Sequence, residues 1–200
     1  MRVEIRADNS VKISGYVNAV CRDSRPIYTA RGRAVEQIEA GVFQRAIQHA
    51  EERVENIALR MNHIQNRDYA GTLDGTLILK EDSIGLRAEA IVTDSEMVEK
   101  AKNKEFRGWS FGCYVTKDHM EERAEDIPRR HVQDMELFEV SLIDHRKNPC
   151  YTGTSIEERA DTEVIIEERS MEDEPEVETP EKKHVDYSEY ETRLSKCKGE

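Results

Sequence analysis

The chain has 200 residues and a mass of 23.1 kDa, and its 42 acidic and 30 basic residues give a formal net charge of −12. This length fits one domain with an extension better than two full-sized domains. The acidic balance argues against a general nucleic-acid binder, because neutralising phosphates takes a surplus of Lys and Arg. No apolar run approaches the roughly 20 residues that span a bilayer, and the first residues lack the apolar core of a secretory signal. We therefore expect a soluble cytosolic protein with no membrane and no nucleic-acid partner.

The four cysteines, Cys21, Cys113, Cys150 and Cys197, stand far apart in the sequence. None belongs to a Cys-x-x-Cys pair, so the strongest signals for a zinc site or a thioredoxin-like site are missing. In a cytosolic protein, isolated cysteines are more often reduced and buried than parts of a disulfide framework. We expect no metal and no cofactor.

The acidic excess is concentrated near the C-terminal end. Residues 157–200 hold 16 acidic and 7 basic residues, a net charge of −9, which leaves −3 for residues 1–156. One apolar patch, Val164 to Ile166, is too small to offset the conformational entropy that this segment would lose on ordering. The sequence therefore predicts a folded domain over residues 1–156 and an acidic, disordered tail over residues 157–200.

Two kinds of apolar periodicity run through the first 156 residues. Alternation of apolar and polar side chains predicts half-buried strands, and apolar side chains at three- and four-residue spacing predict helices. In chain order we expect a strand at 11–17, a helix at 41–51, strands at 55–61, 76–80 and 85–93, a helix at 94–104 capped by Asp94 or Ser95, and strands at 108–116 and 132–143. The last of these is two strands or one bent strand. The majority of strands favours an α+β fold, mainly an antiparallel β-barrel with a few surrounding helices.

Ser110 lies in the strand at 108–116, where the side-chain pattern is easy to follow. Trp109, Phe111 and Cys113 share one face, which is typical of a core, and Ser110 points to the other face. Gly112, its neighbour on that face, leaves room beside the hydroxyl for a substrate backbone. A serine becomes a good nucleophile only when a base takes its proton. Taken alone, Ser110 is more often a small residue that fills a strand.

His63 follows the strand at 55–61 and is the best-placed base. Histidine is the usual base near neutral pH, and catalytic groups tend to sit at strand ends and in loops. A half-exposed histidine without a catalytic role is the alternative. His119, His131 and His145 remain secondary candidates.

Glu139 stands in the alternating run from Leu137 to Ile143. Phe138, Val140 and Leu142 share one face, and Glu139 shares the other with Ser141. A carboxylate at this place either faces water or holds a histidine in the correct tautomer and stabilises its charged form.

Six short segments, in order and at comparable spacing over about residues 10–150, resemble the prohead maturation proteases of tailed bacteriophages. They are Ile13-Ser14-Gly15-Tyr16-Val17, Glu36 to Phe43, Met61-Asn62-His63, Gly85-Leu86, Gly108-Trp109-Ser110-Phe111-Gly112 and Leu137-Phe138-Glu139-Val140-Ser141-Leu142. The resemblance implies a serine endopeptidase related to the herpesvirus assembly proteases, with a β-barrel ringed by helices.

Carried over by position, the resemblance implies that Ser110 is the nucleophile, His63 the general base and Glu139 the third catalytic residue. The chain departs from the family pattern after Leu142, where Thr and a Pro-Ala pair are replaced by Ile143-Asp144-His145. Asp144 and His145 are therefore alternative third residues. The resemblance also suggests that Arg129 and Arg130 lie near the oxyanion hole. In that hole, backbone N–H groups donate hydrogen bonds to the oxyanion.

Such enzymes act in the host cytoplasm, inside the assembling procapsid. Their partners are the major capsid protein and its scaffold segment, and they often cleave themselves. The resemblance leaves the cleavage-site preference and homo-oligomerisation open. Two other hypotheses stay open: Cys113 as the nucleophile, and a non-catalytic module that binds capsid or scaffold, for which the acidic tail would suit a basic inner capsid surface.

Overall fold

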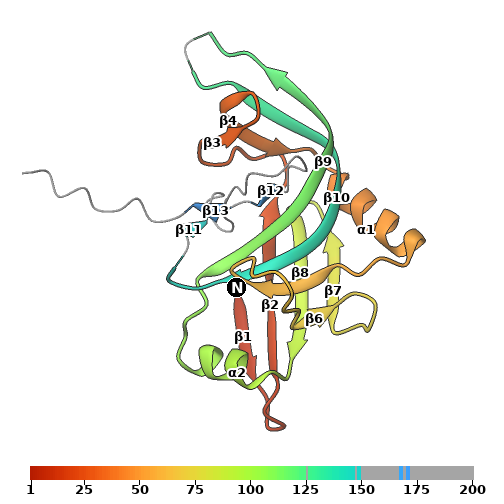
Figure 1. Cartoon of the computed structure of the whole chain (residues 1–200), viewed down its shortest axis with the longest axis vertical. Helices are drawn as coiled ribbons and strands as arrows, with labels where there is room; N and C mark the ends of the chain where they lie inside the picture. Colours follow the sequence, from red (N-terminus) through yellow and green to blue (C-terminus); the bar gives the residue numbers. More distant parts are fainter. Residues whose placement is uncertain (125, 147, 150–166, 169, 172–200) are drawn as a thin grey trace, which may run out of the picture.

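A computed structural model of the chain describes residues 1–124, 126–146, 148–149, 167–168 and 170–171. Strands dominate these residues, as the sequence predicts (Figure 1). The elements are β1 (Arg2–Ile5), β2 (Val11–Ala19), β3 (Ile27–Thr29), β4 (Gly32–Ile38), α1 (Val42–Arg53), β5 (Ala58–Met61), β6 (Ala70–Gly71), β7 (Leu77–Glu81), β8 (Gly85–Val92), α2 (Ser95–Lys102), β9 (Gly108–Glu121), β10 (Arg129–Ile143), β11 (Asn148–Pro149), β12 (Glu167–Glu168) and β13 (Ser170–Met171).

The first sheet is antiparallel, with the strand order β1-β2-β8-β7. Its burial follows the alternation of the sequence: Val11, Ile13 and Val17 of β2 are fully buried. A register shift between Tyr16 and Asn18 marks an irregularity in the β2–β8 pairing. Alternation therefore identified the buried face of this sheet.

The second sheet is built around the long, curved pair β9 and β10 (Figure 1). Its order is β12-β9-β10-β4-β3, and β10 also pairs with β5, which pairs with β6. Strands β4 and β5 both run parallel to β10, β4 along residues 129–132 and β5 along residues 139–142. β10 thus pairs with β9 along its whole length, and with the shorter strands β4 and β5 one after the other.

The prediction of a closed β-barrel is wrong. The described strands form two open sheets of four and seven strands and a small pair, β11 and β13. The α+β class and the predominance of antiparallel pairs are confirmed. Alternation reveals which face of a strand is buried, but the same pattern arises whether that face packs inside a barrel or against another sheet and a helix.

The two helices lie where the sequence predicts them. α1 buries five apolar side chains and lies against β10 and β7, and the Phe43 ring contacts the Phe111 ring edge-on with centroids 5.3 Å apart. α2 begins after Asp94, whose carboxylate accepts the backbone N–H groups of Glu96 and Met97. This N-cap satisfies two amides that the helix itself leaves unpaired.

One apolar core joins the two sheets. Trp109 of β9 is 1% exposed and sits against β2, where a Cβ on Gly15 would come within 2.8 Å of the Trp109 Nε1 atom. A side chain larger than that of glycine would therefore push the sheets apart.

The acidic tail predicted for residues 157–200 lies outside the described residues, apart from β12 and β13. The domain boundary at residue 156 stays a prediction. Among the described residues, no helix is long and apolar enough to cross a membrane.

Candidate active site

His63 is presented by a left-handed turn directly after β5. The strand ends at Met61, as the sequence predicts, and Asn62 and His63 have φ angles of 51° and 59°. Asparagine tolerates this conformation better than most residues, because its short polar side chain bonds locally. Here the Asn62 Oδ1 atom accepts the backbone N–H of Asp144 at 3.2 Å. The turn carries the His63 ring immediately beyond the end of β5.

Ser110 and Glu139 come from the central strand pair. β9 and β10 are antiparallel, and their register sets Ser110 opposite Ser141. Because β5 pairs with the same stretch of β10, the end of β5 lies beside these residues. Three segments that are far apart in the sequence thus meet at one place in the sheet.

The three predicted residues form one chain of hydrogen bonds. The Ser110 Oγ atom lies 2.7 Å from the His63 Nε2 atom, and the His63 Nδ1 atom lies 2.5 Å from the Glu139 Oε1 atom. The side chains of His63 and Glu139 are each 1% exposed, and Ser110 is fully buried. The arrangement has the order nucleophile, base and orienting carboxylate that general-base catalysis by histidine requires.

Ser141 is a fourth member of this network that the sequence analysis did not select. Its hydroxyl donates to the Glu139 Oε2 atom at 2.6 Å and accepts the backbone N–H of His63 at 3.2 Å. One side chain therefore positions both the carboxylate and the main chain that carries the imidazole. The signal was present, since strand alternation put Ser141 on the face of Glu139.

The Glu139 carboxyl is held in its charged form. Burial by itself raises its pKa, but the electrostatic attraction of His63 and the hydrogen bonds from His63 and Ser141 outweigh burial. The pKa of Glu139 consequently lies below its ordinary value. A carboxylate that stays charged can accept the His63 Nδ1–H and leave the Nε2 lone pair directed at Ser110.

Gly112 has a different role from the one expected. The sequence predicts space for a substrate backbone above this glycine, but a Cβ there would lie 2.6 Å from the Glu139 Oε1 atom and 2.8 Å from two Phe138 ring atoms. The space is therefore filled by the protein itself. A register shift between Leu137 and Glu139 makes this possible: Leu137 lies in the core, and Phe138 packs on Tyr114 with ring centroids 5.0 Å apart.

The alternative site residues do not join this hydrogen-bond network. The Asp144 carboxylate binds the Arg146 guanidinium at 2.8 Å and lies 3.5 Å from the Lys100 Nζ atom, and His145 is exposed. Cys113 lies in the hydrophobic core. Of the other histidines, His119 and His131 face each other near the opposite end of the β9–β10 pair.

The arginines expected near an oxyanion hole are also far from Ser110 along the sheet. Arg129 pairs with Glu121 and Arg130 with Met120 in the β9–β10 register, near the far end of β9. The Arg129 guanidinium binds Asp23 and Glu121, and the Arg130 guanidinium binds Asp118 at 2.6 Å. These contacts tie the distal part of the strand pair to its surroundings.

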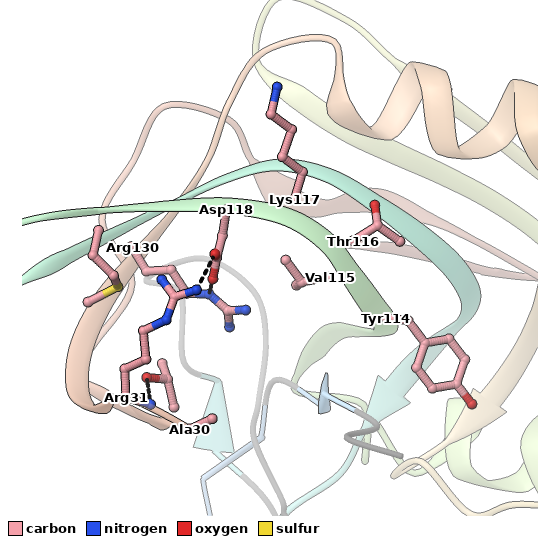
Figure 2. A pocket seen from close by; sticks show the side chains of 10 residues that line it. Ala30, Arg31, Tyr114, Val115, Thr116, Lys117, Asp118 and Arg130 are labelled. Atoms are coloured by element: carbon pink, nitrogen blue, oxygen red, sulfur yellow. Dashed lines mark hydrogen bonds and ion pairs between the residues drawn. The ribbon is translucent and has the colours of Figure 1, made fainter. Parts of the chain in front are cut away.

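A cavity of about 480 Å³ opens along β9 beyond the Ser110–His63–Glu139 network, between Tyr114 and Met120 on one side and Thr29 to Arg31 on the other (Figure 2). The Asp118 carboxylate binds both Arg31, at 3.0 Å, and Arg130 at its edge. The Lys117 side chain points away from this ion pair. Among the described residues, no group of three or more His, Cys, Asp and Glu side chains is placed to hold a metal ion.

A scan against protein families matches the chain to the caudovirus prohead serine proteases over residues 1–172. The chain belongs to this family. The match confirms the family resemblance found in the sequence and covers all three segments that carry the Ser110–His63–Glu139 network. A relation to the herpesvirus enzymes stays a prediction. Searches of curated proteins and of solved structures returned no match.

Proposed function

We propose that this prohead protease is a serine endopeptidase that cleaves scaffold or capsid protein during procapsid maturation. Ser110 is its nucleophile, His63 its general base and Glu139 the residue that orients His63. The observation that carries the proposal is the unbroken hydrogen-bond chain from the Ser110 Oγ atom through both ring nitrogens of His63 to the Glu139 carboxylate.

The reaction follows from this geometry. The Ser110 Oγ atom attacks the carbonyl carbon of a peptide bond while its proton passes to the His63 Nε2 atom. When the tetrahedral intermediate collapses, the C–N bond breaks and His63 returns that proton to the leaving amine. Water then attacks the acyl-enzyme, again losing its proton to His63, and the Ser110 hydroxyl is restored.

Glu139 and Ser141 keep the base ready for this cycle. The carboxylate accepts the Nδ1–H of His63, so the neutral imidazole has its free lone pair on Nε2, and the same carboxylate stabilises the imidazolium that forms during attack. Because Ser141 also binds the main chain of His63, the distance between imidazole and carboxylate is fixed from both ends. Backbone N–H groups are the proposed donors to the oxyanion, since Arg129 and Arg130 bind carboxylates far along the sheet.

The first test is the Ser110→Ala variant, incubated with the phage's capsid protein and scaffold and analysed for discrete cleavage products. We expect a folded protein whose cleavage rate falls by at least about 10³-fold, as for other triad serines. Cys113→Ala serves as the comparison and should retain cleavage, although with some loss of stability, because Cys113 is a core residue. Full cleavage by Ser110→Ala would contradict the assignment.

Self-cleavage and the choice of substrate belong to the same proposal. Intact-mass analysis of the purified chain, and of the Ser110→Ala variant prepared in parallel, detects self-cleavage as fragments that appear in the first sample alone. Fragments in both samples would point to a contaminating protease. Cleavage of capsid protein but not scaffold, or the reverse, identifies the partner that the enzyme processes inside the procapsid.

A further inference from the structure

Arg60 is a charged residue in a strand that is otherwise apolar. The other three residues of β5 (Ala58–Met61) are buried, and the side chain of Arg60 is itself only 20% exposed. Removing a charge from water costs free energy unless other charges or hydrogen bonds compensate for it. The position of Arg60 therefore needs an explanation, and its neighbours in the sheet provide one.

The sheet register places Arg60 on the face that carries the Ser110–His63–Glu139 network. Arg60 of β5 is opposite Ser141 of β10, and Ser141 is opposite Ser110 of β9. Residues opposite each other in neighbouring strands point to the same face of a sheet. The Ser141 hydroxyl binds Glu139 and the main chain of His63, so this face is that of the network. Ser110, Ser141 and Arg60 thus form a row across three strands.

The Asp68 carboxylate holds the Arg60 side chain in place. Its Oδ1 atom accepts the Arg60 Nε–H at 2.8 Å, and Asp68 lies between β5 and β6. The side chain of Asp68 is 45% exposed, more than twice as exposed as that of Arg60. Water screens an exposed charge more strongly than a covered one. Asp68 therefore cancels only part of the positive field that Arg60 creates in the buried network.

The charge of Arg60 acts on Glu139. Burial raises the pKa of the Glu139 carboxyl, and the attraction of His63, the hydrogen bonds from His63 and Ser141 and the attraction of Arg60 together lower it. The His63 Nδ1 atom lies 2.5 Å from the Glu139 Oε1 atom. A positive charge that stabilises the charged form of Glu139 consequently destabilises the charged form of His63 beside it.

Other charged and titratable side chains lie around the turn that carries His63. They are Asp144 and Glu105 with Lys100 and Arg146, and Asp94 and Glu96 with Arg67, which also lies over the Tyr69 ring. Each of these cations binds a carboxylate that is less exposed than itself. Arg60 differs from them, because Asp68 is the more exposed partner of the pair. The positive field at His63 therefore comes mainly from Arg60.

We propose that Arg60 is a positioning residue of the candidate active site: acting through Glu139, its charge opposes protonation of His63 and keeps this base available at lower pH. The inference rests on the proposed function, because it concerns the base assigned there. Asp68 moderates the effect by holding the guanidinium in place and cancelling part of its charge. The charge of Arg60, and not its shape alone, has this role.

Four variants of the full chain separate charge from packing. Arg60→Gln removes the charge, and Arg60→Lys keeps it. Asp68→Asn removes the opposing charge, and the double variant Arg60→Gln/Asp68→Asn removes both. Arg123→Gln is the matched control, because the Arg123 side chain is likewise 20% exposed and binds a carboxylate, that of Asp126 at 3.0 Å, beyond the far end of β9. Thermal unfolding verifies that all variants fold.

The first measurement is the pH dependence of labelling by a fluorophosphonate probe. In this reaction the Ser110 Oγ atom forms a bond to phosphorus, fluoride leaves and the hydroxyl proton passes to His63. The labelling rate therefore rises with pH as His63 loses its proton. We expect the midpoint of this rise to move up by about 0.5–1 pH unit in Arg60→Gln, the effect of removing a nearby, partly cancelled charge. Below the midpoint, this variant should be labelled about three- to tenfold more slowly than the parent chain.

The other variants have expected midpoints of their own. Asp68→Asn should move the midpoint down, by less than Arg60→Gln moves it up, because the Asp68 charge is more strongly screened. The double variant should lie between the two single variants. Arg60→Lys and Arg123→Gln should stay close to the parent chain.

The second measurement does not need a working nucleophile. The Cε1–Hε1 signal of His63, identified by its absence in His63→Ala, is followed by NMR as the pH is varied. Its midpoint should move in the same direction as the labelling midpoint in every variant.

Unchanged midpoints in Arg60→Gln and Asp68→Asn would overturn the inference, since a lower maximal rate at a fixed midpoint reports a structural role alone. A midpoint that moves as far in Arg60→Lys as in Arg60→Gln would also overturn it, because the charge would then have no part in the effect. Shifted NMR midpoints with no labelling at Ser110 in any chain would support the action of Arg60 on His63 and count against the proposed function.

Discussion

At the scale of single residues, Ser141 offers the most specific test of how the triad is held. Its hydroxyl binds the Glu139 carboxylate and the His63 main chain, and it is fully buried. Ser141→Ala should lower the free energy of unfolding by about 1–3 kcal/mol, because two buried groups lose a partner. It should also slow fluorophosphonate labelling of Ser110 by about ten- to a hundredfold, the range expected when a catalytic group is slightly misplaced.

Ser24 provides a matched control for this prediction. Its buried hydroxyl likewise makes two hydrogen bonds, donating to the Arg25 carbonyl at 2.6 Å and accepting the Glu36 N–H at 2.8 Å. Ser24→Ala should therefore cost a similar free energy of unfolding, again about 1–3 kcal/mol, without changing the labelling rate. Equal labelling of both variants, compared at equal fractions of folded protein, would mean that Ser141 has only a structural role.

The Asp144 carboxyl should make the free energy of unfolding depend on pH. Burial by itself raises the pKa of its carboxyl, but hydrogen bonds from Arg146 and Asn62 outweigh it, so the pKa lies well below its ordinary range. A depressed folded-state pKa stabilises the protein at pH values above the unfolded-state pKa, about 3.9 for Asp, and this contribution is lost as the pH falls towards the folded-state value. Urea midpoints of the parent chain and of Asp144→Asn should therefore differ equally at pH 7 and pH 5 and less at pH 3. A difference that does not shrink at pH 3 would contradict this linkage.

At the scale of elements, the irregularity in β10 decides where Glu139 points. Regular alternation puts Phe138 on one face with Val140 and Leu142, as the sequence predicts. The register shift after Leu137 moves Leu137 into the core and Phe138 onto Tyr114. Such a bulge leaves no mark in the alternation of residues 139–143, so the Glu139 side of the strand was predictable and the bulge beside it was not.

Gly112 tests the packing that this irregularity creates. A methyl group at this position would crowd the Glu139 carboxylate and the Phe138 ring. Gly112→Ala should destabilise the protein by about 1–3 kcal/mol, the usual cost of overpacking, and should lower the labelling rate of Ser110 by displacing Glu139. Gly71→Ala in β6 is the matched variant, since its new Cβ would lie 2.5 Å from the Asn56 Oδ1 atom. If both variants are labelled at the same rate, the contact between Gly112 and Glu139 has no effect on the triad.

At the scale of the whole molecule, local periodicity found most of the longer elements but not their arrangement. The strands at β2, β7, β8, β9 and β10 and both helices agree with the sequence analysis. β4 was not predicted, because its alternation is interrupted by Glu36, a fully buried carboxylate that binds Arg130 at 3.4 Å. Its pairing with β10 joins residues that are 94 positions apart in sequence. Contacts at such separations are set by packing of the whole chain, and local patterns contain no record of them.

Gly15 tests whether the two sheets and the candidate active site unfold as one unit. Gly15 belongs to β2 in the first sheet, and its absent side chain makes room for Trp109 of β9, the neighbour of Ser110 in the second sheet. If one core joins the sheets, Gly15→Ala should destabilise the whole domain by about 1–3 kcal/mol, a shift of roughly 1 M in the urea midpoint. The fluorescence of Trp109, the one tryptophan of the chain, far-UV circular dichroism and Ser110 labelling should then shift together, because a cooperative domain has one transition for all probes. A labelling midpoint that stays in place while circular dichroism shifts would show that the sheet carrying Ser110 folds independently of the first, and that the shared core contributes little to holding the triad.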